Sequence, residues 1–169
     1  VSVYGSPGEE AVEQAIGAAI RAGKVRHSLQ SLKMLAVGHT PQGFGFGRAL
    51  DSELLQVFGV TLDAIEAREL IDRARSYTNE ESLACFTEAD AAMVGLKDTP
   101  ESNRQDFARL YRAYATYLQE GDYGALASRC WPDFFTAYGT PVCAVLAMLN
   151  DKKIAASCEA DVYGALSMY

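Results

Sequence analysis

Long apolar runs are missing from this 169-residue sequence, since none approaches the ~20 residues that a membrane-spanning helix needs. Residues 1–10 have neither the basic start nor the apolar segment of a signal peptide. Both absences predict a protein that does not enter a membrane and that is located in the cytoplasm.

Closely spaced cysteine pairs are also missing. The four cysteines are scattered along the chain without a CxxC motif, at Cys85, Cys130, Cys143 and Cys158. This spacing disfavours both a zinc ribbon and a compact disulfide framework. We expect free, buried thiols in a reducing compartment.

An excess of positive charge is absent as well. The sequence has 15 Lys and Arg against 22 Asp and Glu, which gives a net charge of −7. A chain of this charge repels a phosphate backbone unless it carries a basic face, and the sequence does not show one. Nucleic acid is therefore set aside as a partner.

The composition itself is that of an ordinary globular protein, with 49% hydrophobic and 22% charged residues. We expect residues 1–122 to form a Rossmann-like α/β domain that includes a helical layer. Residues 123–169 are expected to start a second α/β domain, which carries the metal and substrate site. The chain begins at Val1 and ends at Tyr169 inside an apolar helical pattern without a stop signal, so we expect a piece of a longer protein.

Helix and strand patterns alternate along the chain. Residues 9–22 have helical periodicity with Gly23 as a stop signal, and residues 51–58 form a helix that Gly59 ends. Further helices are predicted at residues 67–76, 79–95, 101–120, 141–149 and 161–168. Strands are predicted at residues 31–37, 60–66, 124–130 and 154–158. This alternation specifies an α/β fold with a parallel sheet and helices on its faces.

Ligands bind parallel sheets at the carboxyl ends of the strands, so the residues after each predicted strand are the candidates for a site. The first group is the loop 39–47, where His39 can donate to a ligand oxygen or serve as a plain loop residue. Its glycines, Gly43, Gly45 and Gly47, raise the alternative of a dinucleotide-binding turn, with Glu66 after the next strand. Against this alternative, the spacing is GxGxG rather than GxGxxG, and two Phe residues interleave.

The second group follows the strand at 124–130, where Arg129 stands close to Trp131. A guanidinium binds oxygens in a plane and an indole ring offers a flat apolar surface, a combination that suits a sugar. The alternative is a structural ion pair between Arg129 and Asp133, with Trp131 in the core. Cys130 has no base in view and is not taken as a nucleophile.

The third group is Glu159 and Asp161, which come directly after the strand at 154–158. Carboxylate oxygens at this place suit Mg²⁺ or Mn²⁺, which leave positions open for substrate oxygens. Asp161 also stands where the N-cap of the next helix belongs. One acid alone does not hold such a metal, so further ligands are needed.

Taken together, these segments resemble the middle of the L-fucose isomerase family and the related L-arabinose isomerases. The clearest match is the stretch CEADVYGAL at residues 158–166. In these families the Glu of this stretch ligates Mn²⁺ and takes part in proton transfer, and it falls on Glu159. The Asp two residues later falls on Asp161.

A second stretch carries the same resemblance. Arg129-Cys130-Trp131 is similar to an Arg-x-Trp stretch of the L-fucose isomerases that precedes a helix ending in Leu-Asn. Ser128 and Cys130 stand where that family has Gln and His. These replacements prevent a transfer of the family's sugar specificity.

By this resemblance we expect an aldose–ketose isomerase that works through a metal-stabilised enediolate. Glu159 would be the metal ligand and, with Asp161, a catalytic residue, whereas Arg129, Trp131 and His39 would bind the substrate. The resemblance also implies Mn²⁺ or another divalent metal such as Mg²⁺, a monosaccharide substrate and a homo-oligomer. The remaining metal ligands would lie beyond the end of this chain, which alone would be inactive. A nucleotide-dependent oxidoreductase using loop 43–47 and a non-catalytic sugar-binding module are the alternatives.

Overall fold

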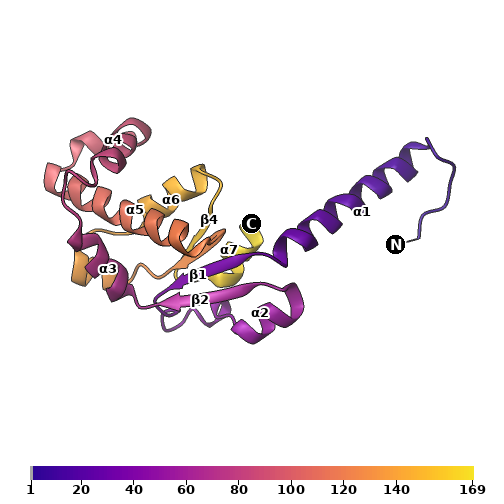
Figure 1. Cartoon of the computed structure of the whole chain (residues 1–169), viewed down its shortest axis with the longest axis horizontal. Helices are drawn as coiled ribbons and strands as arrows, with labels where there is room; N and C mark the ends of the chain where they lie inside the picture. The colour runs from indigo at the N-terminus through magenta and orange to yellow at the C-terminus, as the bar shows by residue number, and fades with distance from the viewer. Residues whose placement is uncertain (1) are drawn as a thin grey trace.

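The computed structural model describes residues 2–169 and is organised around a four-stranded parallel sheet (Figure 1). The strands pair in the order β2-β1-β3-β4, and each of the pairings is parallel. Their bounds are β1 (Lys33–Val37), β2 (Thr61–Ile65), β3 (Ala125–Ser128) and β4 (Ala155–Cys158). The predicted α/β fold with a parallel sheet is therefore confirmed.

Helices connect the strands and cover the sheet on both faces, as the alternating pattern predicts (Figure 1). They are α2 (Asp51–Phe58), α3 (Ala67–Ser76), α4 (Leu83–Ala92), α5 (Glu101–Gly121), α6 (Cys143–Asp151) and α7 (Val162–Met168). Short 3-10 turns lie at Gly45–Gly47 and Leu96–Asp98, and a π-helical turn, which the sequence pattern does not predict, lies at Phe134–Tyr138.

The alternation of side chains along the strands divides the core into two layers. Leu35 and Leu126 belong to the larger layer, in which the sheet packs against α3, α5 and α6. Met34 and Ala127 point to the opposite face and pack against α2 and α7. Both faces are thus covered at β1 and β3, which are almost fully buried and apolar, whereas the edge strand β2 is exposed at Thr61, Asp63 and Ala64.

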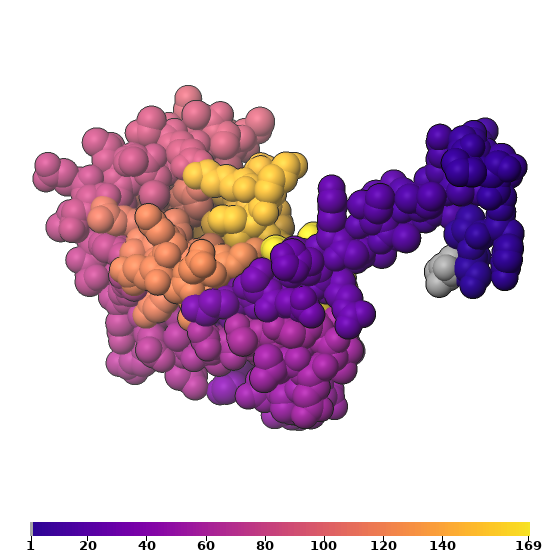
Figure 2. Space-filling view, turned by 45° about the vertical axis from the view of Figure 1, so that its right-hand side comes forward, coloured from indigo at the N-terminus to yellow at the C-terminus, as the bar shows by residue number. Residues whose placement is uncertain are grey.

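Helix α1 (Glu10–Leu29) differs from its prediction because it continues through Gly23. A glycine ends a helix when it adopts a left-handed conformation after the last turn, and Gly23 remains helical. Gly59 has φ 77° and ends α2 as predicted. The helix α1 projects from the body as an arm on which Ile16 and Ile20 are half exposed (Figures 1 and 2). Neither α1 nor any other helix within residues 2–169 is long and apolar enough to cross a membrane.

The predicted domain boundary between residues 122 and 123 lies in the connection from α5 to β3. Strands from both sides of this boundary share the sheet, because β3 pairs with β1 and β4 pairs with β3. The division of the chain into two domains stays a prediction.

Two polar contacts, one fully buried and one partly buried, hold the ends of β3 and β4. The hydroxyl oxygens of Tyr114 on α5 and Ser128 on β3 lie 2.6 Å apart, and the Ser128 hydroxyl donates onward to the carbonyl of Arg129 at 3.2 Å. On α6, Asn150 donates to the carbonyl of Ala156 at 2.8 Å and accepts from its amide at 3.0 Å. The helices therefore fix the points at which the chain leaves these strands.

Replacing Tyr114 with Phe removes one donor from this buried pair. Because Tyr114 and Ser128 are both fully buried, the serine hydroxyl would lose a partner that water cannot replace. We predict a decrease of about 1–3 kcal/mol in the free energy of unfolding, measured by denaturant titration. Tyr4→Phe is the control, because that side chain is 92% exposed. Equal stability of the two variants would contradict the role given to the buried pair.

Candidate functional site

The structure brings the three predicted groups together at the carboxyl edge of the sheet. A Cβ placed on Gly38, which follows β1, would lie 3.1 Å from Cβ of Arg129, which follows β3. A Cβ placed on Gly47 would lie 3.0 Å from Cα of Asp161, which follows β4. These approaches leave no room for a side chain at Gly38 or at Gly47, and they bring the segments that follow β1, β3 and β4 into contact.

Glu159 occupies a constrained position immediately after β4. Its Oε1 accepts a hydrogen bond from the Cys130 thiol at 2.9 Å and a longer one from the Cys158 thiol at 3.6 Å. Glu159 and Ala160 have φ values of 58° and 50°, in the left-handed region that residues with a side chain rarely adopt. Such positions cost roughly 1–3 kcal/mol each and concentrate at functional sites. The geometry therefore favours Glu159 as a site residue.

Asp161 serves as the N-cap of α7. Its Oδ1 accepts a hydrogen bond from the amide of Gly164 at 2.8 Å, and its backbone carbonyl accepts one from the Ser157 hydroxyl at 2.5 Å. Gly164 leaves the space for this cap, because a Cβ there would lie 2.4 Å from Oδ2. Asp161 therefore holds the turn that contains Glu159, and its catalytic role stays a prediction.

For Arg129 and Trp131, the alternative of a structural ion pair with Trp131 in the core is met only in part. The Arg129 Nε donates to the carbonyl of Trp131 at 2.8 Å and lies 3.0 Å from Oδ2 of Asp133, so the ion pair is present. Trp131 is not in the core, because it is 57% exposed and contacts Phe135 edge to face at 5.8 Å. The indole is therefore open to solvent, whereas the Arg129 guanidinium is engaged with Asp133, and the substrate-binding role of both residues stays a prediction.

His39 lies at the rim of the same edge. Its Nε2 is 3.2 Å from Oε1 of Glu66, and both side chains are largely exposed. Glu66 is also part of a capping box with Glu69 at the start of α3. The contact places His39 over the end of β2, where it can reach a ligand in the neighbouring cavity.

A cavity of about 390 Å³ opens beside this rim. Its wall includes His39, Gly43, Gly45, Arg48 and Ala160. Arg48 is exposed and forms no ion pair with any residue in the described range 2–169. The sequence patterns do not mark Arg48 as a site residue, and the only signal for it is its place at the end of the glycine-rich loop.

The dinucleotide alternative finds little support in the arrangement of this loop. The helix α2 begins at Asp51, several residues after Gly47, rather than directly at the glycines. Its first turn contains Asp51 and Glu53, and negative side chains there oppose a pyrophosphate. Glu66, the acid expected to contact a ribose, is engaged with His39 and the start of α3.

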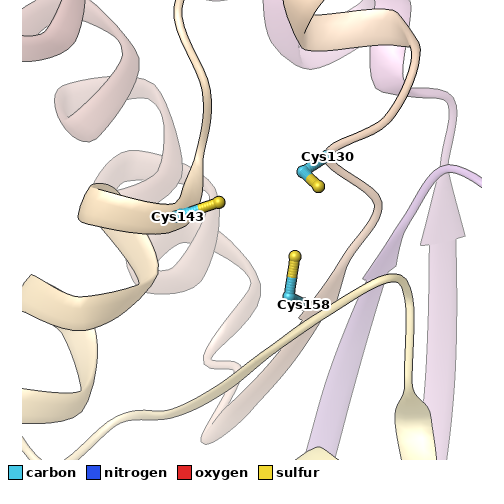
Figure 3. Close-up of side chains that lie close together, drawn as sticks. All are labelled: Cys130, Cys143 and Cys158. Atoms are coloured by element: carbon cyan, nitrogen blue, oxygen red, sulfur yellow. The ribbon is translucent and has the colours of Figure 1, made fainter.

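Three cysteine thiols lie close together at this edge (Figure 3). The Sγ atoms of Cys130, Cys143 and Cys158 all lie within 4.8 Å of one another. Burial, with the neighbouring Glu159, raises the pKa of the Cys130 thiol well above its usual range, and burial also raises the pKa of Cys158. The expectation of free thiols is confirmed, but the expectation that they are buried holds only for Cys130, because Cys143 is exposed and the other two are partly exposed. Spacing along the sequence did not reveal that three of them converge.

The described residues around Glu159 do not supply a full set of ligands for the predicted Mn²⁺ or Mg²⁺. Such ions need several oxygen ligands in a near-octahedral arrangement. Within residues 2–169, the thiol trio is the one group of three or more potential metal ligands, and no comparable set of carboxylates or imidazoles surrounds Glu159. Glu159 therefore fits as a single carboxylate ligand, and the described residues do not form a complete site for a hard cation.

Comparison with known proteins relates the chain to sugar isomerases. No family model matches. Over 167 residues, or 99% of its length, the chain is 66% identical to a protein of Clostridium sp. strain MSTE9, 32% identical to one of Alkalicoccus urumqiensis and 31% identical to one of Priestia aryabhattai. These similarities support a sugar-isomerase family, as predicted. Each of the three relatives is named sulfoquinovose isomerase, so the narrower L-fucose or L-arabinose type stays a prediction.

The chain spans 37 to 38% of the length of these curated relatives. The matched segment includes the carboxyl edge of the sheet with Glu159, the thiols and the cavity. The similarity therefore concerns the region that contains the candidate site.

The raised pKa values predict an order of thiol reactivity. The thiolate is the reactive form, so the buried thiol of Cys130 should react with iodoacetamide far more slowly than the exposed Cys143 near neutral pH. Its rate should increase as the pH rises, because the thiolate fraction then grows. Mass spectrometry of the alkylated peptides measures both rates. Fast alkylation of Cys130 at neutral pH would contradict the described burial and its contact with Glu159.

Proposed function

We propose that this chain supplies a catalytic carboxylate, Glu159, to an aldose–ketose isomerase whose substrate is sulfoquinovose. The proposal rests mainly on the 66% identity, over 99% of the chain, to a protein named sulfoquinovose isomerase. It is supported by the position of Glu159 at the carboxyl edge of a parallel sheet, where such folds bind ligands.

The proposed chemistry moves a proton between two adjacent carbons of the sugar. A carboxylate that lies near both carbons can remove the proton from one and return it to the other. Oε1 of Glu159 is held by the Cys130 thiol, which leaves Oε2 without a protein donor within the described residues. The left-handed turn and the Asp161 cap fix the carboxylate, so that Oε2 carries the proton.

The other groups at the edge have binding roles in this proposal. Sulfoquinovose is an aldose that carries a sulfonate, and a guanidinium is well suited to bind such an anion in a plane. Arg48, in the wall of the 390 Å³ cavity and without an acidic partner within residues 2–169, is assigned this role. Trp131 offers its exposed ring to the sugar, with Arg129 and His39 donating to hydroxyl groups.

The cofactor, assembly and location are parts of the same proposal. A divalent ion such as Mn²⁺ supplies Lewis-acid stabilisation of sugar oxygens in reactions of this kind, and Glu159 would be one of its ligands. Self-association is supported by the half-exposed Ile16 and Ile20 on the projecting helix α1. A cytoplasmic location agrees with free thiols in a reducing compartment.

Replacing Glu159 with Gln tests the central assignment, because the amide keeps the shape but cannot accept the proton. Full-length protein from the native gene, supplied with Mn²⁺, should convert sulfoquinovose into its ketose isomer. We expect kcat of the E159Q variant to fall by about 100-fold or more, followed by NMR of the sugar. Glu13→Gln, on the exposed arm α1, is the matched control. Undiminished turnover by E159Q would show that another group moves the proton.

Replacing Arg48 with Gln tests the substrate assignment. We expect KM for sulfoquinovose to rise by at least about 10-fold, the equivalent of one charge-assisted hydrogen bond of about 1.4 kcal/mol. Glucose, which has a hydroxyl in place of the sulfonate, should be used equally poorly by the variant and the parent. Arg21→Gln on α1 is the control. An equal effect of R48Q on both sugars would indicate a structural role instead.

A further inference from the structure

Three thiols from separate elements lie close together (Figure 3), and two of them, Cys130 and Cys158, contact Glu159. Cys130 follows β3, Cys143 is the first residue of α6 and Cys158 is the last residue of β4. Figure 3 shows their sulfur atoms pointing into the space between these elements. Among the described residues the cysteines are free thiols, so no disulfide accounts for the convergence. The proton transfer proposed for Glu159 does not need three sulfurs.

We propose that Cys130, Cys143 and Cys158 bind a thiophilic divalent cation, Zn²⁺ in the first place, with Glu159 as the fourth ligand. Three thiolates and one carboxylate are a four-coordinate donor set that Zn²⁺ accepts in proteins. Thiolate ligands select Zn²⁺ over the hard ions Mn²⁺ and Mg²⁺. The site is therefore distinct in its chemistry from a Mn²⁺ site at the same carboxylate.

The distances require only a small closure around the ion. With Zn–S bonds of ~2.3 Å, the sulfurs of a tetrahedral site lie about 3.8 Å apart. The three Sγ atoms already lie within 4.8 Å of one another, so each pair must approach by at most about 1 Å. Oε1 of Glu159 is 2.9 Å from Sγ of Cys130 and 3.6 Å from Sγ of Cys158, so the carboxylate already lies against two of the three sulfurs.

The cluster has an entrance and exchangeable protons. Cys143 is exposed and Cys130 is buried, so an ion can enter from the side of Cys143. A thiol must lose its proton to become a metal ligand, so binding releases protons to solvent as the thiolates replace water around the ion.

Sharing of Glu159 couples the thiol site to the proposed isomerase. A cation that holds Oε1 among the sulfurs leaves Oε2 free, but its positive charge makes the carboxylate a weaker base toward the proton of the sugar. This consequence rests on the proposed function, whereas the binding of the cation does not.

Titration of the fully reduced protein with Cd²⁺ tests the site directly, because cadmium–thiolate bonds absorb in the ultraviolet. We expect a charge-transfer band that saturates at one Cd²⁺ per chain and that Zn²⁺ abolishes by competition. Cys143→Ser removes one thiolate at an exposed position that tolerates a polar side chain. Loss of a residue that only supports a ligand weakens metal binding by roughly 10-fold, so loss of a direct ligand should weaken Cd²⁺ binding by more than that. Cys85→Ser is the control, because Cys85 lies outside the cluster, and it should leave the band unchanged.

Three results would overturn the proposal. They are the absence of a band in protein whose circular dichroism shows it folded, an undiminished affinity in C143S, and a loss of the band in C85S. None of these measurements uses a sugar or Mn²⁺, so failure of the thiol site and failure of the isomerase proposal are distinguishable.

Discussion

The parallel register of β1, β3 and β4 is the constraint on which the candidate site depends. Val37 pairs with Ser128, and Ser128 pairs with Cys158, so the three strands end at the same level. The residues that follow them, among them Arg129, Cys130 and Glu159, are therefore delivered to one edge of the sheet. The contacts of Tyr114 and Asn150 then hold β3 and β4 from the helical layer. Without this register, neither the thiol contact to Glu159 nor the wall of the cavity would form.

The two carboxylate oxygens of Glu159 have different surroundings. Its Oε1 faces the soft sulfur atoms of Cys130 and Cys158, while Oε2 has no protein donor within residues 2–169. The oxygen to which the proposed function assigns the proton and the sulfur cluster thus belong to the surroundings of one side chain, whose backbone is held in a left-handed turn. The two proposals differ in the cation they assign to this carboxylate, because ligand softness separates Zn²⁺ from Mn²⁺.

The sequence was informative where local patterns decide the structure. The alternation of strands and helices, the end of α2 at Gly59 and the cap at Asp161 all follow from short-range rules, and each agrees with the structure. Periodicity did not reveal that α1 continues past Gly23, because the conformation of that glycine is not determined by its type. The pattern also did not reveal that Ile16 and Ile20 of α1 are half exposed, because their exposure depends on which other elements pack against this helix.

The candidate site was predictable only in outline. The rule that ligands gather after parallel strands located Glu159, Arg129 and His39 at one edge. It did not reveal the cluster of thiols, because Cys130, Cys143 and Cys158 are distant in sequence and meet through tertiary packing. It also did not reveal the left-handed backbone of Glu159, since no glycine marks that turn.

The most direct measurement is an anomalous difference map from crystals of the full-length protein grown with Mn²⁺. The account predicts a manganese peak in direct contact with the carboxylate of Glu159 at the carboxyl edge of the sheet. An ordered manganese ion bound elsewhere, with Glu159 still hydrogen-bonded to Cys130 and in contact with no metal, would contradict it.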